Sequence, residues 1–274
     1  MMDLVESKMD LAVEWMTKEQ PKYNRYHFAE ILHPDQAQAL KNYLGENNGV
    51  SAIQTANAIT VAFLRCPREI PDPWRLLPFA LYTVETERER KALCVLISLM
   101  QKDPRVEGTE FHTLNALFNH CLRNKLIMEE TVRRDVTEDT SCATLKNWRE
   151  SWKKQGNIEA LMLCHGVRRR AELVRWGVET LDRITTARDI PTLEIYIGVV
   201  HAWLDTARHE LYKGLASEDD GRIPQVTYLM RWDDCKEALH WLITLPNHLS
   251  DEGKRLAKEC YEWMEQSERG RGNA

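Results

Sequence analysis

The chain has 274 residues, of which 43% are apolar and 29% charged, and its formal net charge is −5. This length and apolar content suffice for one large domain, or two of ordinary size, with buried cores. The acidic balance excludes a global electrostatic attraction to nucleic acid or anionic membranes, so either ligand would need a local basic patch.

Composition and apolar spacing predict an all-α fold of multi-helix bundles. Glycine (12 residues) and proline (10) are scarce, which favours long helices with few loops. The best β-branched run, Ile195–Val200, continues into Ala202 and Trp203 at helical spacing, so we interpret it as helix as well. No apolar run approaches the roughly 18–20 residues of a membrane-spanning helix, so we expect any membrane role to be peripheral.

Helix signals follow one another through the first half of the chain. Helices are expected at 3–16, 33–44, 51–64, 73–82, 85–102 and 110–126. Ser51 is expected to cap the third of them, and Ile53 and Leu64 are among its expected core positions.

The helix at 85–102 has the clearest local signals. Thr86 and Glu89 have the spacing of a capping box, in which each side chain satisfies a backbone N–H of the other. Its second half, Ala92–Met100, is apolar nearly all round, which is typical of a central core helix. We therefore expect this helix to organise the first half of the fold.

The second half of the chain also reads as consecutive helices. They are expected at 141–155, 158–166, 167–185, 191–215, 231–245 and 250–268. Gly156 is expected to end the first of them, because glycine disfavours the helix interior. This pattern predicts two domains, a helical N-terminal domain at 1–158 and a helical C-terminal domain at 159–274.

Neither the cysteines nor the histidines form a recognisable site. The seven cysteines contain no CxxC pair, which indicates free thiols in a reducing compartment. The nine histidines lack the spacing of a metal motif, and no phosphate-binding loop or nucleophile motif is present. We therefore expect no metal, no cofactor and no enzymatic activity.

Three groups of basic residues are candidate binding sites for phosphate or lipid headgroups. They are Arg88, Arg90 and Lys91; Arg123 and Lys125; and Arg168, Arg169, Arg170 and Arg175. For the last group we favour the alternative that it forms a solvated helix face paired with Glu172 and Glu179. Sequence leaves open whether the three groups meet on one surface.

Tryptophans recur in the second half of the chain. They are Trp148, Trp152, Trp176, Trp203, Trp232, Trp241 and Trp263. On amphipathic helices such residues pack mostly in the core, and some anchor interfaces between protomers.

Two short stretches resemble orthomyxovirus matrix proteins. The run Arg65–Trp74, RCPREIPDPW, resembles a segment of the influenza C and D type. The run Thr83–Arg88, TVETER, looks like the capped start of the central helix in the influenza A matrix protein. The resemblance covers about residues 50–130 and suggests a divergent member of the family, such as a thogotovirus protein.

The resemblance implies an N-terminal matrix-like domain of two packed helical bundles followed by a helical C-terminal domain. It further implies self-assembly beneath a viral envelope, with contacts to anionic membrane lipids, viral ribonucleoprotein and envelope glycoprotein tails. The protein would lie in the virion, in the host cytoplasm and nucleus, and at the inner face of the plasma membrane.

In this resemblance Arg88, Arg90 and Lys91 fall at basic positions of the family's central helix. Arg123 and Lys125 fall near its basic nuclear-localisation and RNA-binding segment, which is reduced here to Arg-Asn-Lys. The influenza A zinc motif has no counterpart, and this chain is acidic where the influenza A protein is strongly basic.

Two other classes of function stay open. The first is a soluble all-helical adaptor or regulatory protein that binds partners through its Trp-rich second half. The second, less favoured, is a metal-dependent helical enzyme. Self-assembly would distinguish a matrix protein from an adaptor, and metal content would identify the enzyme.

Overall fold

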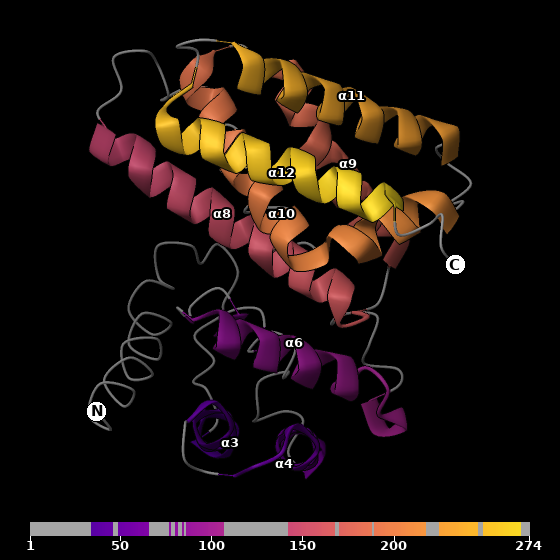
Figure 1. The fold of residues 1–274 in the computed structure, drawn as a ribbon. Coiled ribbons are helices and arrows are strands. Elements are labelled where there is room, and N and C mark those ends of the chain that lie inside the picture. The colour runs from indigo at the N-terminus through magenta and orange to yellow at the C-terminus, as the bar shows by residue number, and fades with distance from the viewer. Residues whose placement is uncertain are drawn as a thin grey trace, which may run out of the picture. The chain divides into compact units, whose positions relative to one another are not determined.

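The computed structural model describes residues 34–45, 49–65, 77, 80–81, 84, 86–106, 142–167, 170–187, 189–217, 225–245 and 249–269. Within these ranges the chain forms eight α-helices, one short 3-10 helix and no strand, which confirms the all-α prediction (Figure 1). The predicted helices at 3–16 and 110–126, and most of 73–82, lie outside the described residues.

The chain divides into two compact units, Met1–Leu122 and Arg123–Ala274. The division differs from the predicted domain boundary after residue 158. That position lies inside one continuous helix, Cys142–Cys164.

The first unit contains three described α-helices. They are α3 (Pro34–Leu44), α4 (Ala52–Arg65) and α6 (Glu87–Met100), with the 3-10 helix η1 (Pro104–Val106) after them. Figure 1 views α3 and α4 nearly end-on, with α6 running across them. The Tyr43 hydroxyl donates a hydrogen bond to the Ala92 carbonyl (3.1 Å) and so joins α3 to α6.

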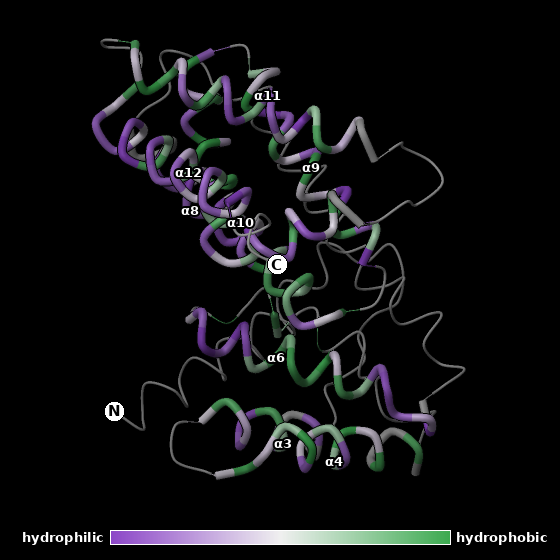
Figure 2. Tube along the Cα trace, turned by 45° about the vertical axis from the view of Figure 1, so that its right-hand side comes forward, coloured by the Kyte–Doolittle hydropathy of each residue, from purple (hydrophilic) through white to green (hydrophobic). Residues whose placement is uncertain are grey.

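Helix α6 forms as its sequence predicts. Thr86 Oγ1 accepts the Glu89 N–H (3.2 Å), and the Glu89 carboxylate accepts the Thr86 N–H (3.0 Å), which completes the capping box. The buried residues of α6 are Leu93, Cys94, Leu96, Ile97, Ser98 and Met100. The helix is therefore hydrophilic at its start and hydrophobic through its second half (Figure 2).

Helix α4 corrects the expected core of the first unit. Ser51 caps it as predicted, since its Oγ accepts the Gln54 N–H (3.2 Å). Ile53 and Leu64, however, are 69% and 43% exposed rather than buried. At about 100° per residue both lie roughly a quarter turn or more from the centre of the buried face, which is formed by Ala56 and Ile59 and their neighbours.

The described residues of the second unit form five helices. They are α8 (Cys142–Cys164), α9 (Arg170–Thr186), α10 (Ile190–Ser217), α11 (Gln225–Thr244) and α12 (Asp251–Arg269). Helix α10 packs against each of the other four (Figure 1). Central burial explains why its β-branched run Ile195–Val200 is helical, as predicted, because tertiary packing outweighs intrinsic strand propensity.

Tryptophans form much of the core of the second unit, as their positions on amphipathic helices predicted. Trp152, Trp176, Trp203 and Trp232 are each at most 2% exposed. Two of the indole N–H groups find carboxylates. Trp203 donates to Glu159 (3.3 Å), and Trp232 donates to Glu268 (2.9 Å). Trp241, by contrast, is 57% exposed.

Glycines set the close approach of α8 and α9 to α10. A Cβ on Gly156 would lie 2.9 Å from Val199 Cγ1 and 3.1 Å from the Val199 carbonyl oxygen. A Cβ on Gly177 would lie 2.6 Å from Leu211, and one on Gly214 would lie 2.5 Å from Val174. The prediction that Gly156 ends a helix is therefore wrong. Packing compensates its helix penalty of about 1 kcal/mol, and α8 continues through it.

The buried Glu194 carboxylate joins three helices of the second unit. Glu194, on α10, is 7% exposed and forms an ion pair with Arg149 of α8. Its Oε1 also accepts the backbone N–H of Ser250 (2.5 Å), directly before α12. Gly253 provides the space, because a Cβ there would lie 3.1 Å from Glu194 Oε1. The carboxylate thus meets an arginine and the positive end of a helix dipole at once.

Gly156→Ala should destabilise the protein by about 1–2 kcal/mol, because overpacking against Val199 outweighs the gain in helix propensity. Gly198→Ala in α10 is the matched control, since a Cβ there meets nothing within 4 Å. The control should stabilise the protein by up to about 1 kcal/mol. Chemical denaturation followed by tryptophan fluorescence measures both. Equal stabilisation by the two alanines would contradict the packing argument.

Glu194→Ala should destabilise the protein by roughly 3 kcal/mol, because it leaves Arg149 and the Ser250 N–H without their acceptor. Glu194→Gln keeps an oxygen for Ser250 and removes only the charge, so its loss should be smaller. The unfolding free energies of both variants, each also made with Arg149→Met, separate the capping hydrogen bond from the ion pair. If Ala and Gln behave alike, the hydrogen bond to Ser250 contributes nothing.

Candidate functional site

The predicted basic group on α6 is partly engaged by its own unit. Arg88 is exposed, and its Nη2 donates to the Leu44 carbonyl (3.1 Å). Lys91 Nζ lies 3.6 Å from Glu87 Oε1, and both side chains are more than half exposed. Burial lowers the pKa of the half-buried Arg90, against the charges of Glu87 and Glu89. Arg88 and Lys91 are therefore the outward-facing cations of this group.

The remaining predicted cations do not form a described patch. Arg170 pairs with Glu210 (2.9 Å). Arg175 lies 3.6 Å from Glu172 and 3.7 Å from Glu179, which are the partners that the solvated-face alternative named. Arg123, Lys125, Arg168 and Arg169 lie outside the described residues.

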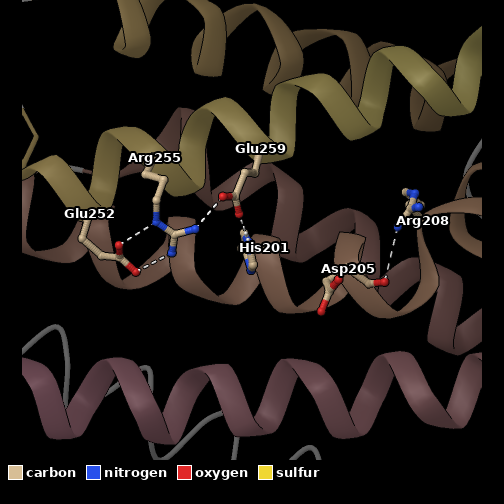
Figure 3. Close-up of polar contacts among 6 residues, drawn as sticks. All are labelled: His201, Asp205, Arg208, Glu252, Arg255 and Glu259. Carbon is tan, nitrogen blue, oxygen red and sulfur yellow. Dashed lines mark hydrogen bonds and ion pairs between the residues drawn. The ribbon is translucent and has the colours of Figure 1, made fainter.

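A denser polar cluster, absent from the sequence prediction, lies where α10 meets α12 (Figure 3). We call it the seam cluster. Its members are His201, Asp205 and Arg208 on α10, and Glu252, Arg255 and Glu259 on α12. His201 Nε2 lies 2.8 Å from Glu259 Oε2. Because a carboxylate only accepts hydrogen bonds, this nitrogen carries the proton.

Arg255 continues the network along α12. Its Nη1 donates to Glu259 (2.5 Å), and its Nε and Nη2 donate to the two oxygens of Glu252 (2.9 and 2.8 Å). The hydrogen bond from His201 is the largest cause that holds the pKa of Glu259 below its usual value, and Arg255 acts in the same direction. The hydrogen bonds from Arg255 likewise lower the pKa of Glu252.

An aromatic ring lies at the other end of the cluster. Trp263 of α12 is 4.7 Å from the His201 ring and 5.5 Å from the Arg208 guanidinium, centre to centre. Arg208 also donates to the Asp205 carbonyl (3.4 Å), next to Ala207, where α10 leaves helical geometry (φ −134°, ψ 17°). The kink in α10 therefore lies next to the cation–π contact between Arg208 and Trp263, which joins α10 to α12.

This arrangement connects α10 to α12 through the pair His201–Glu259 and the contact of Arg208 with Trp263. None of its six members is a hydroxyl or thiol nucleophile.

Within the described ranges, no three His, Cys, Asp or Glu side chains lie close enough together to hold a metal ion. None of the described helices has the length and apolar content needed to cross a membrane. A shallow pocket of about 440 Å³ between α3 and α4 is lined only by neutral side chains.

Part of the seam cluster had a sequence signal. Glu252, Arg255 and Glu259 follow one another at three and four residues, the spacing of ion pairs on one helix face. His201 and Glu259 are 58 positions apart in the sequence, so no local pattern predicts their contact.

The comparisons with known proteins add no relative. No family model, no curated protein and no solved structure matches this chain.

Glu259→Gln should reduce stability by less than about 1 kcal/mol at neutral pH, because the ion pair is partly exposed. The pKa of Glu259 is lowered in the folded chain, so its stabilisation is present above the ordinary carboxyl pKa of 4.5 and is lost as pH falls through the folded value. The difference between the original and the variant should therefore vanish in acid. Unfolding free energies across this pH range test it.

Glu150→Gln on α8 is the control for that experiment, because Glu150 is exposed and forms no ion pair with the described residues. Its effect should be small at every pH. A Glu259→Gln difference that persists below the folded pKa would contradict the electrostatic account.

Proposed function

We propose that this protein is a non-catalytic structural protein of the viral matrix type, which assembles beneath an envelope and contacts anionic lipids. The observation that carries the proposal is the position of Arg88 and Lys91. Both are exposed in the first turns of α6, the helix that carries the resemblance. Its capped start and buried second half support the same assignment.

The proposal includes the finer organisation that the resemblance implies. The N-terminal domain would consist of two packed bundles, and the protein would bridge membrane lipids and viral ribonucleoprotein, with glycoprotein tails as further partners. Two exposed cations give weak attraction per molecule. Assembly supplies the remainder, because linked weak contacts multiply in effect.

The adaptor alternative has one observation in its favour. Four of the tryptophans on which the adaptor alternative relied are buried in the core of the second unit. Met230 and Trp241, on α11, are nevertheless 58% and 57% exposed and offer apolar contacts to a partner. A one-to-one complex without self-assembly would favour this function.

The chain should co-sediment with phosphatidylserine vesicles, and binding should weaken as salt is raised. Arg88→Gln/Lys91→Gln should weaken binding by at least about tenfold, since each cation near an anionic surface contributes about 1 kcal/mol. Lys146→Gln/Lys153→Gln is the matched control. It removes two exposed cations from α8 and should change binding little. Thermal melts of all variants exclude unfolding as the cause.

Equal weakening by both double variants would contradict the assignment of the lipid contact to α6. A chain that ignores these vesicles and stays monomeric at high concentration, as judged by light scattering, would overturn the matrix proposal itself.

A further inference from the structure

Helix α11 has two chemically different faces. Its buried residues, which include Trp232, Cys235 and Leu239, pack toward α9 and α12. The opposite side carries seven exposed residues among those described, including His240 and Thr244. The other five, which we call the outer face of α11, are Met230, Asp233, Asp234, Glu237 and Trp241. Met230, Asp234, Glu237 and Trp241 follow one another at steps of four, three and four residues and therefore line one stripe.

The ends of this stripe are apolar. Met230 is 58% exposed and Trp241 is 57% exposed, whereas Trp152, Trp176 and Trp203 of the same unit are at most 2% exposed. Tryptophan is the side chain that most often dominates the energy of protein interfaces, and methionine adapts its shape to varied partners. The ends therefore have the chemistry of anchors for an apolar side chain.

The middle of the stripe is acidic. Asp234 and Glu237 form no ion pair within the part of the chain that the structure describes, and Asp233 interacts electrostatically with Lys236. On neighbouring α12, by contrast, Glu252, Glu259 and Glu265 are all paired with cations. The outer face thus presents negative charge that no described neighbour neutralises fully.

We propose that the outer face of α11 binds a basic, amphipathic segment of another protein. Lysine or arginine side chains of that segment meet Asp234 and Glu237, and its apolar residues meet Trp241 and Met230. The 11 residue-to-residue steps from Met230 to Trp241 span about 16 Å, the length of about three turns of a partner helix. The same carboxylates repel phosphate, so nucleic acid and anionic bilayers are excluded as occupants.

This surface is independent of the lipid contact proposed for α6. One surface is basic and belongs to the first unit, and the other is acidic and belongs to the second. Either proposal can therefore fail while the other stands.

A fluorescent, amphipathic Lys–Leu helical peptide of about four turns is the probe, with its Glu–Leu counterpart as the negative control. The full chain should bind the first and ignore the second in an anisotropy titration. Asp234→Asn/Glu237→Gln should weaken binding by about tenfold and flatten its salt dependence. Trp241→Ser should weaken it by about tenfold and leave the salt dependence unchanged.

Two control variants are matched to these. Glu150→Gln/Glu262→Gln removes the same number of exposed carboxylates from α8 and α12, and Ile53→Ser removes an exposed apolar side chain from α4. Each should shift affinity by less than about twofold. Hydrogen exchange should show protection of residues 230–241 on binding. No binding of the Lys–Leu peptide, equal losses in the controls, or protection elsewhere would each overturn the proposal.

Discussion

The Glu194 carboxylate is the point on which the second unit depends. A buried charge is costly unless it is paired and hydrogen-bonded, and this one is satisfied only when α8, α10 and α12 are all in place. Arg149 comes from one helix, the Ser250 N–H from the start of another, and the space for the carboxylate from Gly253. The interaction therefore selects one arrangement of three helices, where apolar burial alone would tolerate several.

The seam cluster also joins α10 to α12. Glu194 fixes the start of α12 against α10, and His201 with Glu259 holds them together farther along. The kink at Ala207 lies beyond this second contact. These two polar contacts therefore position α12 against α10 at two points along its length.

Local signals in the sequence predict most helices of the described chain, including the capping box at Thr86 and the helical state of Ile195–Val200. The predictions fail where residues distant in the sequence determine a helix end or a side-chain contact. Gly156 has the sequence signature of a helix end, but Val199, on another helix, makes it an interior contact. The partners of Arg170 and His201 lie 40 and 58 positions away, so these two contacts leave no local pattern in the sequence.

The three glycines that face the α8–α10 and α9–α10 contacts also constrain how this protein can change over evolutionary time. Their role is defined by space alone, so only a small residue can replace them, whereas surface charges can be exchanged or moved. A distant relative that has lost all overall similarity should still carry small residues at the equivalents of Gly156, Gly177 and Gly214. The spacing of these positions is thus a signature by which such relatives can be recognised.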